Sequence, residues 1–189
     1  MTKTKAAKIS KPKVTCEEIL CAGFGGQGIM FMGKLLAEAG LMAGKFVTWM
    51  PSYGAEVRGG TAYSMAKIST GEIASPVVTN PDILVAMNEP SLVKYEPMVK
   101  PGGIIIANKS LISKPARRKD IKFVNIQLTT LASALGSTKC ANMIAIGAIA
   151  NRSKTILLKN VLGALKEALK DKEDLLALNK KALERGYKV

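Results

Sequence analysis

Histidine is absent from this sequence of 189 residues, and cysteine is scarce. Without His the chain can hold no Ser-His-Asp or Cys-His triad, no His-ligated zinc and no His acid–base catalyst. Its three cysteines, Cys16, Cys21 and Cys140, are too few and too poorly spaced for an iron–sulfur cluster or a zinc site. We expect no metal ligands here, and we interpret the cysteines as small core residues of a cytoplasmic protein.

Large aromatic side chains and long apolar runs are also lacking. There are four Phe, four Tyr and one Trp, although 48% of the residues are hydrophobic, so the core must be mainly aliphatic. The longest apolar stretches, such as residues 143–150, fall well short of the roughly 20 residues that span a bilayer. We therefore expect a protein without a membrane segment, the size of one domain.

Acidic residues are half as numerous as basic ones, 14 against 28, which gives a formal net charge of +14. Part of this excess lies in residues 1–15, which we predict to be a disordered basic tail preceding one domain over residues 16–189. No helix-turn-helix, RNP or zinc-finger motif accompanies the charge, and we expect no nucleic-acid partner.

The apolar residues form short compact runs that alternate with helical patterns, which is typical of an α/β fold. We predict a three-layer α/β/α domain with a mainly parallel, possibly mixed, sheet and C-terminal helices. Gly44 is predicted to close the first helix, Pro51 to end the second strand, and Gly186 to stop the last helix. The predicted strands are 19–23, 46–50, 61–69, 82–87, 104–107 and 121–126, and the predicted helices are 27–43, 129–135, 140–151, 155–170 and 171–185.

A glycine-rich turn, Gly23-Phe24-Gly25-Gly26-Gln27-Gly28, follows the first strand and opens the first helix. Such a turn lets backbone approach a ligand and offers helix N–H groups to an anion. A dinucleotide site would also need an acid at the end of the second strand, and residues 47–51 contain none. An NAD site is therefore disfavoured, which leaves a ligand-free turn, a phosphate- or pantetheine-bearing ligand, or a partner's backbone.

A second glycine-rich loop, residues 51–61, follows the second strand and contains Arg58 between flexible neighbours. In a parallel sheet both loops would lie along the same carboxyl edge, where α/β proteins bind their ligands. A guanidinium there is suited to forked contacts with phosphate or carboxylate, although a solvated charge on a turn is the alternative.

These two loops, together with further motifs, closely resemble the gamma subunit of 2-oxoacid:ferredoxin oxidoreductases. The resemblance spans roughly residues 16–187. The sequence is most similar to the 2-oxoglutarate type of this subunit and next to the 2-oxoisovalerate type. An indolepyruvate enzyme is a further alternative. Ala55, where Pro is expected, and Glu89 depart from the pattern. The matching segments are 25–28, 51–54, 56–62, 73–78, 81–82, 87–92, 99–103 and 142–148.

The resemblance implies a subunit of an enzyme that converts a 2-oxoacid and coenzyme A to an acyl-CoA and CO2 while reducing ferredoxin. It implies alpha and beta subunits and a ferredoxin-like delta subunit as partners, which hold thiamine diphosphate, Mg and the iron–sulfur clusters. The chain itself has no Gly-Asp-Gly thiamine signature and no cluster-type cysteine run. No catalytic residue is then expected in this chain, which would cover the active site and help form the coenzyme A pocket.

On this reading, the glycine turn contacts the pantetheine or diphosphate of coenzyme A, and Arg58 contacts a phosphate. Asn142, at the start of a helix, either contacts the ligand or a loop, or caps the helix. A purely structural gamma subunit that touches no ligand is a further alternative. The residues predicted to bind coenzyme A are Gly25, Gly26, Gln27, Gly28, Tyr53, Arg58, Gly59, Gly60 and Asn142.

Overall fold

A computed structural model describes residues 14–53 and 61–189 of the chain. The strands are β1 (Cys16–Phe24), β2 (Phe46–Tyr53), β3 (Thr61–Ser69), β4 (Ile83–Ala86), β5 (Ile104–Asn108) and β6 (Lys122–Ile126). The α-helices are α1 (Ile29–Met42), α2 (Glu89–Tyr95), α3 (Leu128–Ala134), α4 (Ala141–Ala150), α5 (Leu158–Ala168) and α6 (Glu173–Tyr187). Single 3₁₀ turns lie at Glu96–Met98 and Thr138–Cys140.

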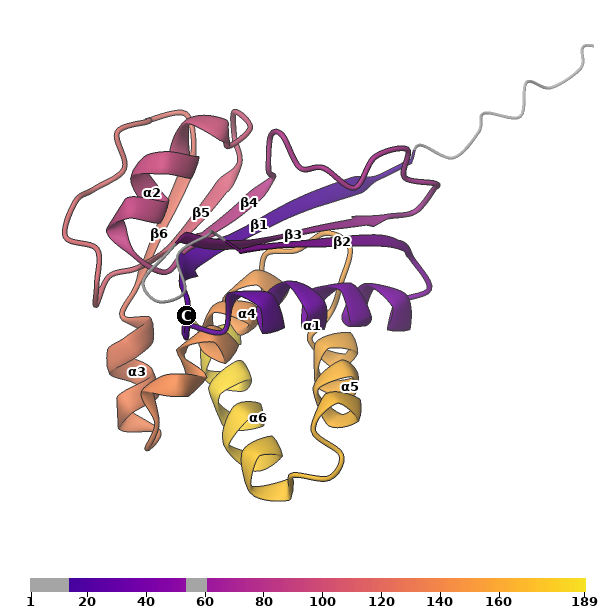
Figure 1. Ribbon diagram of the computed structural model, residues 1–189, viewed down its shortest axis with the longest axis vertical. Coiled ribbons are helices and arrows are strands. Elements are labelled where there is room, and N and C mark those ends of the chain that lie inside the picture. Colours follow the sequence, from indigo (N-terminus) through magenta and orange to yellow (C-terminus); the bar gives the residue numbers. More distant parts are fainter. Residues whose placement is uncertain (1–13, 54–60) are drawn as a thin grey trace, which may run out of the picture.

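The strands form one mixed sheet in the order β2-β3-β1-β4-β5-β6. β1, β4, β5 and β6 are parallel, whereas β3 runs antiparallel to both of its neighbours, β1 and β2. β2 therefore points the same way as β1. The predicted mixed, mainly parallel sheet is confirmed, and the carboxyl ends of five strands lie at one edge (Figure 1).

Alternate residues of the central strands enter two separate cores, one on each face of the sheet. In β4, Ile83 and Val85 pack with α1 and α3–α6, whereas Leu84 and Ala86 pack with α2. All four β4 residues are buried, which is why the sequence shows a continuous apolar run instead of alternation. The helices lie on both faces of the sheet, which confirms the three-layer architecture (Figure 1).

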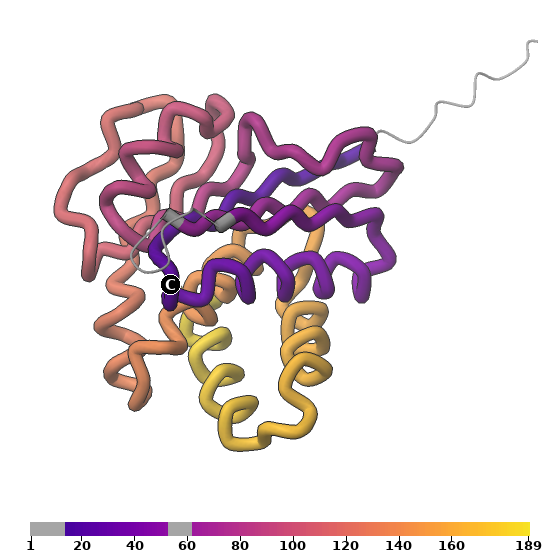
Figure 2. The backbone as a smooth tube through the Cα atoms, in the orientation of Figure 1, coloured from indigo at the N-terminus to yellow at the C-terminus, as the bar shows by residue number. Residues whose placement is uncertain are grey.

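α4 is enclosed on all sides, since every one of its residues is buried. It lies between the sheet and α6, which returns from the α5–α6 hairpin to pack along it (Figure 2). Within the described ranges, none of the helices is long and apolar enough to cross a membrane.

Two predicted element ends are wrong, and each has a physical reason. Pro51 lies inside β2 and pairs with Ser64. β2 is an edge strand, where a residue without an N–H is tolerated. Gly186 lies inside α6 and does not stop it. A Cβ at Gly186 would lie 1.9 Å from the carbonyl oxygen of Ile144 in α4, so this glycine permits a helix crossing.

Gly44 does follow the first helix in a left-handed conformation, with φ of 67°, as predicted. Its N–H donates to the carbonyl of Leu41 at 2.9 Å. α2, in contrast, was missed from the sequence. Its signal is Asn88, whose side chain caps the helix by accepting a hydrogen bond from the N–H of Ser91 at 2.9 Å, followed by a proline in the first turn.

The three cysteines differ in exposure, which makes a simple labelling prediction. Cys16 is exposed, whereas Cys21 and Cys140 are buried. Burial raises the pKa of the Cys21 thiol to about 12, so this thiol stays protonated and unreactive at neutral pH. We expect a disulfide reagent such as DTNB at pH 8 to modify Cys16 alone in the native protein and all three thiols after denaturation. A Cys16→Ser variant that still reacts when native would contradict the burial of the other two.

Candidate functional site

The glycine-rich turn joins β1 to α1 and is held by the side chain of Gln27. Its Oε1 accepts hydrogen bonds from the main-chain N–H of Phe24 at 2.7 Å and from Nδ2 of Asn88 at 3.3 Å. Its Nε2 donates to the carbonyl of Met87 at 3.4 Å. Gln27 thus braces the turn against the end of β4, a role that sequence reasoning did not assign to it.

The glycines of the turn have different requirements. Gly26 and Gly28 have φ of 95° and 73°, a left-handed backbone that favours glycine. Gly25 has neither positive φ nor a neighbour, since a Cβ there would meet no atom within 4 Å among the described residues. The lack of side chains at Gly25 and Gly26 therefore leaves open space beside the backbone, as close approach of a ligand requires.

Asn142 is brought against the turn from the far part of the chain. A Cβ on Gly28 would lie 2.2 Å from Nδ2 of Asn142, so the amide packs directly on this glycine. Only 8% of the surface of Asn142 is exposed. It lies in the first turn of α4, whose N-cap is Cys140 without a side-chain cap. Its Oδ1 also accepts a hydrogen bond from the N–H of Met143 at 2.8 Å, so Asn142 both packs on the glycine turn and satisfies an N–H at the start of α4. Its contact with a ligand stays a prediction.

A pocket of about 210 Å³ opens beside the turn, at the carboxyl ends of the parallel strands. Gly26 and Gln27 follow β1, Met87 follows β4, and Leu111 follows β5. Thr129 follows β6, and the segment that leads into α4 closes the pocket. Its lining residues are Gly26, Gln27, Met87, Leu111, Thr129, Thr138, Lys139 and Ala141.

The electrostatics of this pocket favour an anion. Its described lining contains Lys139 and no carboxylate, and no ion pair to Lys139 is formed within the described ranges. α1 begins beside the pocket with no acid in its first turn and no side-chain cap, so its N-terminal N–H groups remain available. α4 differs, since the N–H of Ala141 donates to the carbonyl of Thr138 and that of Met143 donates to Oδ1 of Asn142.

Of the remaining residues predicted to bind coenzyme A, the structure describes only Tyr53. Tyr53 ends β2 and pairs with Ala62, next to the pairing of Phe24 with Thr61. The second loop therefore starts at the same edge as the glycine turn, as predicted. Arg58, Gly59 and Gly60 lie outside the described residues. Sequence reasoning missed Leu111, Thr129, Thr138 and Lys139, because these residues share no motif and meet only through the order of the strands.

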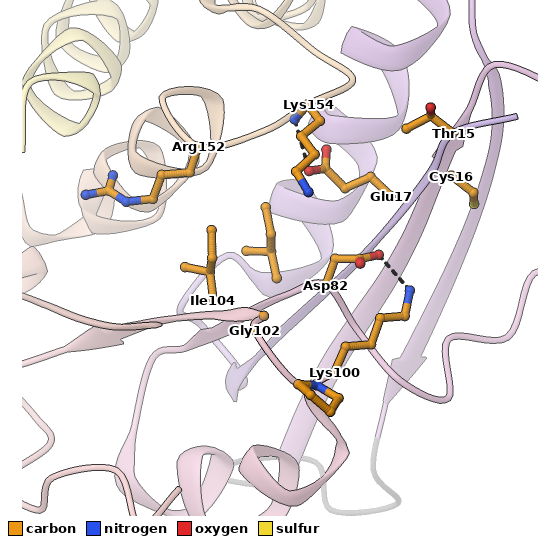
Figure 3. Close-up of a pocket in the computed structure, with 12 residues that line it drawn as sticks. Thr15, Cys16, Glu17, Asp82, Lys100, Gly102, Ile104, Arg152 and Lys154 are labelled. Carbon is orange, nitrogen blue, oxygen red and sulfur yellow. Dashed lines mark hydrogen bonds and ion pairs between the residues drawn. The ribbon is translucent and has the colours of Figure 1, made fainter. Parts of the chain in front are cut away.

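A second pocket of about 210 Å³ lies at the opposite, amino edge of the sheet (Figure 3). There the Glu17 carboxylate accepts hydrogen bonds from Ser153 Oγ, Thr155 Oγ1 and the N–H of Lys154, which tie β1 to the segment after α4. Nζ of Lys100 lies 2.8 Å from Oδ2 of Asp82.

Lys100 also lies 3.1 Å from Oε2 of Glu18, which in turn pairs with Lys67 at 2.7 Å. Burial lowers the pKa of Lys100, but the carboxylates of Asp82 and Glu18 outweigh it and hold that pKa above its ordinary value. The carboxylates at this edge thus pair with lysines or accept hydrogen bonds and join structural elements, whereas Arg152 and Lys154, which also line the pocket, form no ion pair with a side chain in the described part of the chain. Among the described residues no group of His, Cys, Asp and Glu is arranged to hold a metal.

Comparison with known proteins gives a consistent result. A family model described as pyruvate ferredoxin/flavodoxin oxidoreductase matches residues 18–189. The chain is 32% identical over 179 residues to ketoisovalerate oxidoreductase subunit VorA of Methanothermobacter thermautotrophicus, covering 94% of this chain and 37% of that one. It is 35% identical over 162 residues to 2-oxoglutarate synthase subunit KorC of the same organism, covering 82% of this chain and 84% of that one.

Two solved structures share the fold. A keto/oxoacid ferredoxin oxidoreductase gamma subunit from Geobacter sulfurreducens superposes with a TM-score of 0.80 at 28% identity, over 91% of this chain and 96% of that one. The second is the 2-oxoglutarate:ferredoxin oxidoreductase of Magnetococcus marinus with 2-oxoglutarate, coenzyme A and succinyl-CoA bound. It superposes with a TM-score of 0.84 at 25% identity, over 92% of this chain and 30% of that one. The chain thus spans about a third of the longest of these relatives.

Proposed function

The chain belongs to the pyruvate ferredoxin/flavodoxin oxidoreductase family, and from that premise we propose that it is the gamma subunit of a 2-oxoacid:ferredoxin oxidoreductase. The observation that carries the proposal is the family match over residues 18–189, nearly the whole described chain. The assembled enzyme would convert a 2-oxoacid and coenzyme A to an acyl-CoA and CO2, with two electrons passing to ferredoxin. Alpha, beta and delta subunits would supply thiamine diphosphate, Mg and the iron–sulfur clusters.

The substrate we propose is 2-oxoglutarate. It is supported by the KorC relatives, with identities of 35% and 33% for two of them. The VorA relatives support 2-oxoisovalerate as the second candidate, at identities of 32% and 31%. A cytoplasmic location stays a prediction from the sequence.

The part of this subunit in the reaction is to bind coenzyme A at the carboxyl edge of the sheet. The open backbone of Gly25 and Gly26, the N-terminus of α1 and Lys139 suit a phosphate-bearing ligand. A pocket of about 210 Å³ is smaller than the roughly 300–1,000 Å³ of sites that enclose a whole ligand of drug size. It would therefore take one portion of coenzyme A, and a neighbouring subunit would cover the rest. Arg58, Gly59, Gly60 and Tyr53 remain proposed contacts.

The proposal is tested by co-expressing the chain with the alpha, beta and delta genes of its source and assaying 2-oxoacids with viologen as electron acceptor. We expect a stable complex that forms acyl-CoA only when this chain is present, with 2-oxoglutarate as the best substrate. A complex that forms without the chain and has full activity would contradict the proposal. Preference for 2-oxoisovalerate would contradict the proposed substrate but not the proposed role as a gamma subunit.

Lys139→Gln in that complex is expected to raise the KM for coenzyme A about fivefold, because it removes the cation of the pocket while keeping a polar side chain. The kcat should stay within about twofold, since Lys139 would bind substrate and transition state equally. The matched control is Lys94→Gln on α2, an exposed lysine on the other face of the sheet. Equal KM values for Lys139→Gln and the wild type would show that Lys139 does not bind coenzyme A.

A further inference from the structure

An apolar groove lies between α5 and α6. These two helices form a hairpin that extends away from the sheet (Figure 1). The groove has a volume of about 330 Å³, and three leucines are among its lining residues. Two exposed lysines, one from each helix, also line it. The lining residues are Leu162, Gly163, Leu165, Lys166, Leu176 and Lys180.

A second hollow, of about 450 Å³, lies where α1 ends and α5 begins. Its lining residues are Met42, Ala43, Lys45, Lys154, Thr155, Leu157, Lys159 and Asn160. Met42 connects the two hollows, because its Sδ would lie 2.9 Å from a Cβ on Gly163 of the groove. Met42 and Leu157 are 47% and 59% exposed, so an apolar strip continues from the groove into this hollow. We name the two hollows together the α5 surface.

The charge of the α5 surface has one sign. Lysines line both hollows, and their described linings contain no carboxylate. Within residues 14–53 and 61–189, the ion pairs involve none of these lysines. Residues 151–189 as a whole carry ten basic and five acidic side chains. The α5 surface therefore presents an apolar strip flanked by unpaired cations.

We propose that the α5 surface docks an amphipathic, acid-flanked segment of a partner subunit. The inference rests on the proposed function, which places this chain in a complex. In VorA and in the Magnetococcus marinus enzyme the matching region is part of a chain about three times as long, so in those proteins it is joined to further polypeptide. An apolar strip with a charged rim is the usual composition of such a protein interface. Acidic flanks on the partner complement the lysines and steer its approach.

The test uses the co-expressed complex with the photo-crosslinker p-benzoylphenylalanine replacing Leu176 in the groove. We expect a cross-link, mapped by mass spectrometry, to a peptide of another subunit that contains apolar and acidic residues. The matched control places the same crosslinker at Val93 of α2, which is 46% exposed on the opposite face. A cross-link to a second copy of this chain, or none at Leu176 in an active complex, would overturn the proposal.

Charge reversal gives a second, independent measurement. The double variant Lys166→Glu and Lys180→Glu is expected to weaken binding of this chain to the other subunits about tenfold, because like charges then face the acidic segment. The control double variant, Lys94→Glu and Lys122→Glu, makes the same change of charge away from the α5 surface. Equal affinities for the two double variants would refute the docking site. Failure of the wild-type chain to bind any subunit would refute the proposed function as well, so the two failures are distinguishable.

Discussion

Gly186→Ala is expected to destabilise the domain by about 3 kcal/mol or more, at the upper end of what overpacking costs. The added Cβ would lie 1.9 Å from the carbonyl oxygen of Ile144, and the backbone of α4 cannot rotate away as a side chain can. Gly147 has the reciprocal position, since its Cβ would lie 2.1 Å from the carbonyl oxygen of Leu183. The two helices must therefore separate, and α4 is buried in the centre of the larger core.

Urea denaturation of the purified chain measures this loss. Gly163→Ala in α5 is the matched control, because the atom nearest to its Cβ is the flexible Sδ of Met42, at 2.9 Å. That variant should change the free energy of unfolding by no more than about 1 kcal/mol, since alanine also gains helix propensity. If the midpoints of Gly186→Ala and Gly163→Ala coincide, the close crossing of α4 and α6 does not exist.

Gly28→Ala is expected to raise the KM for coenzyme A at least about tenfold in the assembled enzyme. Two effects combine at this position. A left-handed φ of 73° disfavours alanine, at a cost of about 1–2 kcal/mol. The Cβ would also lie 2.2 Å from Nδ2 of Asn142, which forces the glycine turn and the start of α4 apart. Both elements border the proposed coenzyme A pocket.

Steady-state kinetics with varied coenzyme A measure the combined loss, and urea denaturation without coenzyme A separates the two effects. Gly26→Ala shares the positive φ, at 95°, but its Cβ meets no described atom within 4 Å, so its free energy of unfolding reports backbone strain alone. Gly25→Ala has neither feature and should leave the turn intact. Adding Asn142→Ala to Gly28→Ala removes the steric conflict and should recover part of the KM. Equal free energies of unfolding for Gly28→Ala and Gly26→Ala would mean that the contact with Asn142 is immaterial.

The strands of the sheet were predicted correctly because the apolar patterns that indicate them are formed by neighbouring residues. Short apolar runs and, over residues 61–69, an alternating pattern identified the six strands, and the fold class followed from their alternation with helical patterns. The errors arose where tertiary context overrides a local rule. Pro51 is tolerated because β2 lies at the edge, and Gly186 serves a helix crossing instead of a helix end. α2, only seven residues long, was missed because it is too short for a helical period to emerge.

The sequence by itself determined the family and the glycine turn, since both are patterns of neighbouring residues. It also placed Asn142 among the candidates, but it left contact and cap as alternatives. Only the tertiary structure shows that Asn142 does both, since its Nδ2 packs on Gly28 from a helix more than a hundred residues away while its Oδ1 accepts from the N–H of Met143. The pocket itself was decided in the same way. Leu111, Thr129 and Lys139 join it because parallel strands deliver their following loops to one edge, and the strand order that makes them neighbours results from long-range pairing that local patterns do not specify.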